Sequence, residues 1–205
     1  MKRLFDIYVI TDRRLVPGGD LVEFLRVHVA GLAEANAAVQ LREKDLFTRE
    51  LWRLYESVER VLRGAGVPLL VNDRLDVALA AGADGVHLPQ AGIPVEAARK
   101  MLPAEMLLGV STHNMAELAE AQAGGADFIT FGPVYDTASK RQYGPPVGET
   151  ALAEATKGGV PVFALGGVKP KHTRNLVALG ARGIACISAV LAASDPGAAL
   201  RAFAG

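Results

Sequence analysis

Short runs of apolar residues recur along the chain, and each run ends at a polar residue or a glycine. The runs are nearly continuous rather than alternating, which is typical of parallel strands that are covered on both faces. They predict eight strands, at Ile7–Thr11, Ala37–Arg42, Pro68–Asp73, Asp84–Leu88, Met106–Ser111, Asp127–Pro133, Val160–Gly167 and Gly183–Ala189.

The stretches between these runs carry apolar residues three and four positions apart, which is the spacing of one helix face. Two such faces consist of Leu21, Phe24, Leu25, Val29 and Leu32, and of Leu51, Leu54, Val58 and Leu62. Gly-Ala-Asp or Gly-Ala-Arg triplets at 82–84, 125–127 and 180–182 precede three of the strands. These triplets predict helix ends that are followed by tight turns.

Alternating strands and helices fit either a doubly wound sheet or a closed (β/α)₈ barrel. The count of eight regularly spaced units favours the barrel, at the short end of the size range for that fold. The chain has no linker, repeat array or change of composition, so residues 1–205 are expected to form a single TIM-barrel domain.

The charges cancel, since 22 basic and 22 acidic residues leave a formal net charge of zero. This balance argues against a nucleic-acid partner, which would normally require a basic excess. Half of the residues are hydrophobic, which excludes the disordered classes. Cys186 is the sole cysteine, and this excludes both an intrachain disulfide and a cysteine-cluster metal site.

No apolar run reaches the roughly 18 residues that a membrane span needs. Asp6 interrupts the apolar start that a signal peptide would have. We therefore expect a cytoplasmic protein with no membrane partner. The apolar helix faces could cover either the barrel or a second subunit, so the sequence leaves a homo-oligomer open.

In a barrel of this kind, the chemistry belongs at the carboxyl ends of the strands. Gln40, Arg42 and Lys44 alternate at the end of the second predicted strand, so their side chains share one side and face the lumen or its mouth. Polar groups there are costly without a compensating partner. The pattern therefore favours a ligand site over a buried structural ion pair.

Other strand ends offer candidates that have two interpretations each. Asn72 and Asp73 end the third strand, either as site residues or as caps of the next helix. His87 ends the fourth strand, and a histidine in such a place is more often a core residue than a ligand-binding one. His113 lies next to a helix start, as a site residue or as an exposed one.

Gly166-Gly167 and Ile187-Ser188 follow the seventh and eighth strands. Barrels often bind phosphate at these two places, through backbone N–H groups and a helix N-terminus. Lys140 adds a positive charge in the loop after the sixth strand. The segment Arg141–Gly148 is interpreted as a flexible lid, with an ordinary surface loop as the alternative.

These candidates fall within short motifs that are spread in order over nearly the whole chain. The motifs are YVITD at 8–12, QLREK at 40–44, VNDR at 71–74, GVHL at 85–88, GVSTH at 109–113, GPV at 132–134, TASK at 137–140, LGG at 165–167 and IS at 187–188. The ordered set resembles the thiamine-phosphate synthase/TenI superfamily. That resemblance implies a (β/α)₈ barrel, in agreement with the strand count.

Synthases of this superfamily join 4-amino-5-hydroxymethyl-2-methylpyrimidine diphosphate to 4-methyl-5-(β-hydroxyethyl)thiazole phosphate, and release pyrophosphate with the help of Mg²⁺. The resemblance implies that the pyrimidine diphosphate is held by Gln40, Arg42, Lys44, Asn72, Ser111 and Lys140. It implies that Thr137 and Ser139 contact the thiazole phosphate substrate and that Gly167, Ile187 and Ser188 hold its phosphate, with Gly166 of the glycine pair as a further substrate-binding candidate.

The chain departs from the synthase pattern at one place. Synthases usually bind Mg²⁺ with two aspartates, one matching Asp73 and the other matching the position of Gly92. Mg²⁺ needs few protein carboxylates, so binding through Asp73 and the diphosphate is expected to be weaker rather than lost. The missing carboxylate points to the TenI branch, whose members aromatise a thiazole carboxylate phosphate tautomer without a metal.

We therefore favour a TenI-like thiazole tautomerase without a cofactor over a thiamine-phosphate synthase with Mg²⁺ at Asp73. Some tautomerases use a histidine after the sixth strand, where this chain has Pro133. His113 and His87 are then the candidates for the acid and base, with Lys140 as a further catalytic candidate. A third hypothesis is a non-catalytic regulator that binds thiazole phosphate.

Overall fold

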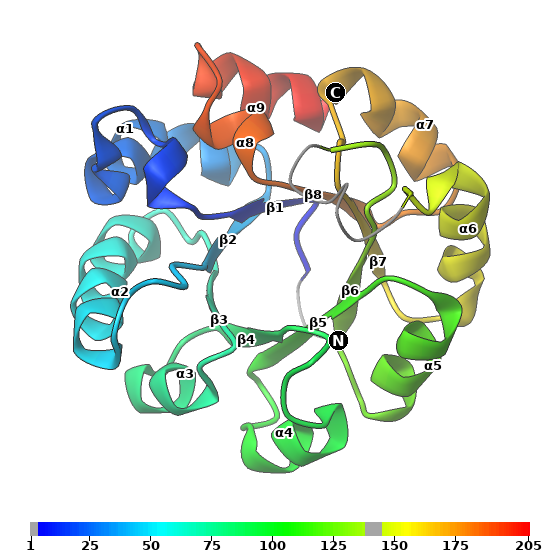
Figure 1. Ribbon diagram of the computed structural model, residues 1–205. Helices are drawn as coiled ribbons and strands as arrows, with labels where there is room; N and C mark the ends of the chain where they lie inside the picture. Colours follow the sequence, from blue (N-terminus) through cyan, green and yellow to red (C-terminus); the bar gives the residue numbers. More distant parts are fainter. Residues whose placement is uncertain (1–3, 138–144) are drawn as a thin grey trace.

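The computed structural model describes residues 4–137 and 145–205, and over these ranges eight parallel strands close into a barrel (Figure 1). The strands are β1 (Ile7–Ile10), β2 (Ala37–Leu41), β3 (Leu69–Asn72), β4 (Gly85–Leu88), β5 (Leu107–Thr112), β6 (Phe128–Phe131), β7 (Val162–Leu165) and β8 (Gly183–Cys186). Each strand pairs with the next in the chain, and β8 pairs with β1. The predicted (β/α)₈ barrel is confirmed.

Each predicted strand is present, but most are shorter than the apolar run that predicted them. Thr11, Arg42 and Asp73 lie beyond the ends of β1, β2 and β3, where the chain turns away from the sheet. The backbone N–H of Thr11 still donates to Gln40 O at 2.9 Å, so the hydrogen bonding between β1 and β2 continues for one residue beyond the end of β1. Hydrophobicity therefore marks the buried run, whereas hydrogen bonding sets the strand end.

Helices form an outer ring around the barrel (Figure 1). They are α1 (Leu21–Glu34), α2 (Thr48–Arg63), α3 (Leu75–Ala81), α4 (Val95–Met101), α5 (Met115–Ala123), α6 (Gly148–Ala155), α7 (Thr173–Ala178), α8 (Ser188–Leu191) and α9 (Pro196–Ala204). Short 3₁₀ turns supplement them, including η1 (Arg13–Leu15) directly after β1. Within the described ranges, no helix is both long and apolar enough to span a lipid bilayer.

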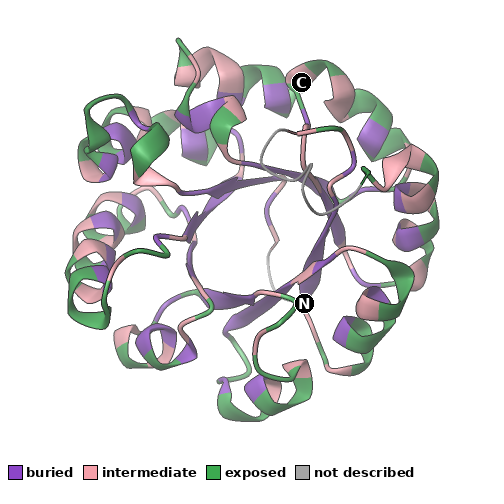
Figure 2. Cartoon of the chain, viewed as in Figure 1, coloured by how far each residue is buried: buried purple, intermediate pink, exposed green. Residues whose placement is uncertain are grey.

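The helix faces predicted from the apolar spacing pack against the sheet. In α1, Val29 is half-buried while the other four predicted face residues are buried. In α2, Leu54 is half-buried while the other three predicted face residues are buried, and Tyr55 is buried in addition. Figure 2 shows the buried sides of the helices turned toward the barrel. The triplets also behave as predicted, because Gly82, Gly125 and Gly180 have φ values of 62°, 87° and 97°.

The barrel lumen holds a second core, separate from the one between sheet and helices. Near the amino ends of the strands, four aromatic rings fill it: Phe5, Tyr8, Phe128 and Phe163, which we call the aromatic plug. Phe5 touches each of the other three rings, with centroids 4.9–5.3 Å away. The plug fills the lumen near the amino ends of the strands, so the polar part of the described lumen lies toward their carboxyl ends.

Candidate active site

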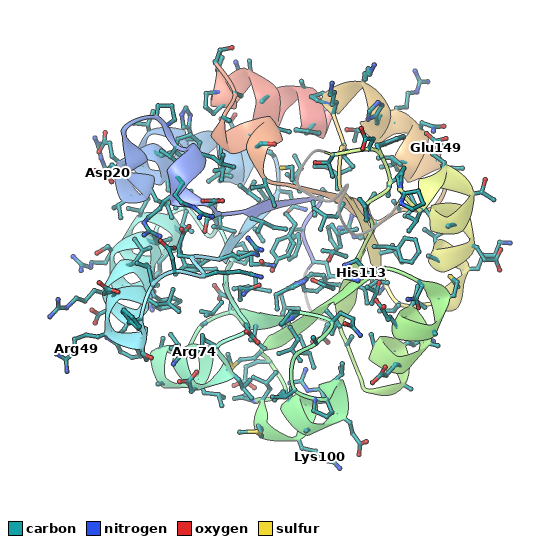
Figure 3. All side chains as sticks on the ribbon, viewed as in Figure 1. Asp20, Arg49, Arg74, Lys100, His113 and Glu149 are labelled. Carbon is teal, nitrogen blue, oxygen red and sulfur yellow. The ribbon has the colours of Figure 1, made fainter. Side chains whose placement is uncertain are left out.

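A cavity of about 170 Å³ opens at the carboxyl end of the barrel, above the aromatic plug. Its lining includes a residue at or just beyond the end of every strand: Ile10, Gln40, Arg42, Lys44, Asn72, His87, Pro89, Gln90, Ser111, Thr112, His113, Thr130, Gly132, Pro133, Leu165, Gly166 and Ile187. Figure 3 places His113 over the barrel opening, whereas Arg49 and Lys100 lie on the outer helices.

The structure brings together many of the site residues expected from the sequence. Those that line the cavity are Gln40, Arg42, Lys44, Asn72, His87, Ser111, His113, Gly166 and Ile187. Those that are described but do not line it are Asp73, Thr137, Gly167 and Ser188. Ser139, Lys140 and the part of the expected lid at 141–144 lie outside the described residues.

The end of β2 is tied to the loop after β1 by Glu43, a residue that the sequence did not single out. Thr11 Oγ1 donates to the buried Glu43 carboxylate at 2.7 Å, and Arg13 donates to it from its backbone N–H at 3.1 Å and its guanidinium at 3.0 Å. The Thr11 hydroxyl also accepts from the backbone N–H of Arg42 at 2.9 Å. Glu43 therefore fixes the segment that carries Arg42 and Lys44.

Arg42 is a half-buried cation that faces the cavity. Among the described residues its guanidinium forms no ion pair, because Glu43 is paired with Arg13 instead. Burial lowers the pKa of Arg42, while the carboxylates of Asp12 and Glu43 act in the opposite direction. A guanidinium remains protonated at neutral pH even so. The described residues therefore give no structural ion pair for Arg42, and its role in ligand binding stays a prediction.

Gln40 and His87 form the buried polar floor of the cavity, directly above the aromatic plug. Gln40 Nε2 donates to the Tyr8 hydroxyl at 3.1 Å, which joins the floor to the plug. His87 Nε2 lies 3.0 Å from Ser111 Oγ. Burial, helped by the charge of Arg42, lowers the pKa of His87 to about 3, so its imidazole is neutral at physiological pH.

The other ring nitrogen of His87, Nδ1, is buried and has no hydrogen-bond partner among the described residues. It lies so close to Gly109 that a Cβ atom there would be 2.5 Å away. An orphaned buried N–H is rarer in folded proteins than an orphaned acceptor, so the proton belongs on Nε2. Nε2 then donates to Ser111, and this leaves the Ser111 hydroxyl proton free to point at a ligand.

His113 sits at the cavity mouth, one residue before the N-cap of α5. Its Nδ1 is 3.0 Å from Glu117 Oε2, and its backbone N–H donates to the same oxygen at 2.7 Å. Asn114 caps the helix by accepting from the backbone N–H of Glu117 at 3.0 Å. His113 is therefore both a helix-start residue and a wall of the cavity, and its acid/base role stays a prediction.

The neighbouring residues Asn72 and Asp73 differ in whether they face the cavity. Asn72 lines the cavity, whereas Asp73 is exposed and has a φ of 64°, a left-handed conformation that aspartate tolerates better than most residues. The capping alternative is wrong for both, because α3 begins after Arg74 without a side-chain cap.

A magnesium ion would find few protein ligands here. Gly92 offers no carboxylate, Asp73 does not line the cavity, and the described ranges contain no cluster of three or more histidine, cysteine, aspartate or glutamate side chains suited to a metal. Mg²⁺ prefers carboxylates and phosphate oxygens. The residues present therefore do not fit a metal site built by the protein alone.

Backbone conformation and close packing explain why glycines follow β7. Gly166 and Gly167 have φ values of 93° and 66°, and a Cβ on either would come within 2.5–2.8 Å of atoms of the loop after β6. Gly166 and Ile187 also line the cavity, and Ile187 is the N-cap residue of α8. Phosphate binding at these residues stays a prediction.

The fold and the cavity together define a (β/α)₈-barrel protein whose cavity lies at the carboxyl ends of its strands and is lined by polar side chains together with apolar ones such as Ile10, Leu165 and Ile187. Within that class, residues 7–190 match the model of the family described as thiamine monophosphate synthase, and the chain belongs to this family of enzymes.

Relatives agree along nearly the full length. A Geobacter sulfurreducens protein, provisionally named a thiamine-phosphate synthase, is 50% identical over 97% of this chain and 92% of its own. The Roseiflexus castenholzii thiamine-phosphate synthase is 43% identical over 96% of this chain and 86% of its own. Among solved structures, thiamine phosphate pyrophosphorylase from Pyrococcus furiosus matches with a TM-score of 0.85 and 34% identity, over 97% of this chain and 93% of its own.

These relatives bear on the choice between the two enzyme branches. Their names are those of synthases, and none of these three is named a tautomerase. The preference for a TenI-like tautomerase is therefore not supported by the comparisons. The synthase alternative is the better supported of the two.

Proposed function

We propose that the protein is a thiamine-phosphate synthase, which couples hydroxymethylpyrimidine diphosphate to thiazole phosphate and releases pyrophosphate. The observation that carries the proposal is the division of one cavity into a neutral polar floor and a cationic rim. Gln40, His87 and Ser111 line the floor, while Arg42 and Lys44 line the rim. This polarity suits a ligand with an uncharged heteroaromatic head and a diphosphate tail.

In this reaction the bond between the pyrimidine methylene carbon and a diphosphate oxygen breaks, and its electron pair leaves with the diphosphate. The thiazole nitrogen supplies the electron pair for the new carbon–nitrogen bond. Arg42 and Lys44 would stabilise the negative charge that grows on the leaving group. The buried floor would hold the pyrimidine away from water while its methylene carbon is electron-deficient.

The neutrality of His87 matters to this chemistry. A protonated imidazole would face both the Arg42 charge and the developing positive charge on the substrate. Burial keeps the pKa of His87 at about 3, so the floor offers hydrogen bonds without a repelling charge. Under this proposal His87 acts as a positioning residue that orients Ser111, and no acid/base step is assigned to it.

The described residues build no Mg²⁺ site by themselves, so the reaction steps above are assigned to protein side chains alone. The diphosphate would bring most of the ligands of such an ion, with Asp73 as the carboxylate that the family resemblance offers. Gly92→Asp would restore the second carboxylate, with a small shift because its Cβ would lie 3.0 Å from Pro89 O. We expect the variant to reach half-maximal coupling at a lower Mg²⁺ concentration than the wild type.

The decisive experiment offers the purified protein both synthase substrates with Mg²⁺ and, separately, the thiazole tautomer. We expect thiamine phosphate from the first mixture and no accelerated aromatisation in the second. The missing carboxylate at Gly92 keeps the tautomerase as a second candidate, and the reverse pair of results would establish it. Binding of thiazole phosphate without turnover in either mixture would favour the regulator.

A further inference from the structure

Thr130 is a buried residue of the cavity floor whose hydroxyl lacks a hydrogen-bond partner. It is 1% exposed, lines the cavity, and its Oγ1 contacts no donor or acceptor among the described residues. Its backbone carbonyl accepts from Thr112 Oγ1 at 3.1 Å, so the main chain at this point is held in place. The unsatisfied group is the side chain alone.

The position of Thr130 in the sheet explains where its side chain is directed. It pairs in register with Ser111 on β5 and with Phe163 on β7. Phe128, two residues earlier on the same strand, belongs to the aromatic plug, so Thr130 is the next lumen-facing residue above it. Thr130 therefore stands where the lumen changes from apolar to polar.

A buried hydroxyl without a partner costs free energy in the folded protein, and valine has the same shape without that cost. A ligand in the cavity would supply the missing partner. A hydroxyl can donate to a ring nitrogen or accept from an amino group, and the neighbouring Ser111 has a free hydroxyl proton if Nε2 of His87 carries the imidazole proton. Two adjacent strands thus present two hydroxyls to the same part of the cavity.

We propose that the Thr130 hydroxyl binds the aminopyrimidine ring of the diphosphate substrate, beside Ser111, and so helps to select that ring. This inference rests on the proposed synthase function. The diphosphate belongs at the cationic rim with Arg42, which leaves the ring on the neutral floor. The aminopyrimidine carries several donors and acceptors, whereas the nitrogen of the thiazole is the nucleophile and must remain free.

The test is calorimetric binding of pyrimidine diphosphate, without the thiazole substrate, to wild type, Thr130→Val and Thr130→Ser. We expect valine to weaken binding about tenfold and serine to keep it within about threefold. Thermal unfolding of the free Thr130→Val protein should occur at the same or a higher temperature, since an unsatisfied hydroxyl is removed. In steady-state assays the KM for pyrimidine diphosphate should rise while the KM for thiazole phosphate stays unchanged.

Thr173→Val is the matched control, because the Thr173 Oγ1 atom is also buried with no hydrogen-bond partner among residues 4–137 and 145–205, but lies outside the cavity lining. It should match Thr130→Val in stability and the wild type in binding. If the wild type binds no pyrimidine diphosphate, the proposed function fails. If wild type and Thr130→Val bind pyrimidine diphosphate equally well, the role of Thr130 is overturned. It is also overturned if Thr130→Val loses affinity for thiazole phosphate instead of for pyrimidine diphosphate. A lower unfolding temperature for Thr130→Val would also overturn it, by showing that the hydroxyl has a partner in the protein.

Discussion

The two halves of the barrel lumen differ in the interactions that their buried side chains make. In the amino half, Phe5, Phe128 and Phe163 of the aromatic plug pack ring against ring without hydrogen bonds, and the hydroxyl of Tyr8, the fourth ring, accepts from Gln40. In the carboxyl half, His87 Nδ1 and Thr130 Oγ1 are buried and have no hydrogen-bond partner in the described part of the chain. The plug stabilises the fold, whereas the polar half includes the Thr130 hydroxyl, whose missing hydrogen bond we propose that a ligand supplies. Stability and binding are thus separated along the barrel axis.

The largest expected effect tests the stabilising half. Phe128→Ala should lower the free energy of unfolding by about 3–5 kcal/mol, because it removes a fully buried ring and leaves a cavity among the remaining aromatics. Urea unfolding measures this loss. Phe47→Ala is the control, since Phe47 is 81% exposed and its loss should change stability by no more than about 0.5 kcal/mol. Similar stability for both variants would contradict the role given to the plug.

The next effect tests the binding half. Arg42→Met should lower the rate of coupling by about 10²–10³, because a positive charge aimed at the leaving diphosphate is lost. Arg49→Met, on the outer face of α2, should leave the rate unchanged (Figure 3). The fold should tolerate Arg42→Met, since Arg42 has no ion pair among the described residues to lose. A large fall in its unfolding temperature would show that Arg42 belongs to the stabilising half after all.

A pH effect of intermediate size is expected from His87. Its pKa in the folded protein, about 3, lies below the value of about 6.5 in an unfolded chain, so the unfolded state binds the proton first. The stability associated with this residue is therefore present above about pH 6.5 and is lost as the pH falls toward 3. Between pH 7.5 and pH 5 the loss should be about 2 kcal/mol.

His87→Gln provides the comparison for this pH effect, because an amide does not titrate in that range. The difference between the unfolding free energies of wild type and variant should shrink as the pH is lowered from 7.5 to 5. Chemical unfolding at several pH values measures it. A difference that stays constant with pH would mean that the imidazole takes up a proton in the folded state, contrary to the neutral floor described above.

The smallest expected effect concerns the contact that joins the two halves. Tyr8→Phe keeps the ring of the plug but removes the hydroxyl that accepts from Gln40 Nε2. We expect a loss of about 1 kcal/mol in unfolding free energy and a modest rise in KM for pyrimidine diphosphate, because the Gln40 amide is no longer held. Unchanged stability together with unchanged KM would show that the two halves are independent at this point.

The fold was predictable because buried parallel strands have nearly continuous apolar sequences and the helices have a clear period. The cavity lining was partly predictable, since Gln40 of the floor and Arg42 and Lys44 of the rim are polar at alternating positions where apolar residues are expected. Glu43 was missed because it lies between two of these positions, where a charged residue would normally be exposed. Its burial results from Thr11 and Arg13, some 30 residues earlier in the chain.

Thr130 was missed for a different reason. Threonine is common in strands, so the sequence FITF at 128–131 is typical of an ordinary buried strand. Nothing local distinguishes a threonine that faces the helices from one that faces the lumen. The pairing of β6 with β5 and β7 decides it, and pairing is a property of the whole barrel. The same holds for the Tyr8 hydroxyl, whose partner lies on the next strand.

The contribution of every strand to the cavity lining makes the site modular. Gln40 on β2 and Thr130 on β6 come from strands on opposite sides of the closed ring, so substitutions at the two should change binding energy additively. Ser111 and Thr130 lie on paired strands and should depart from additivity. Residues on one side of such a site can therefore be substituted to accept a new ligand without changing the contribution to binding of the residues on the opposite side.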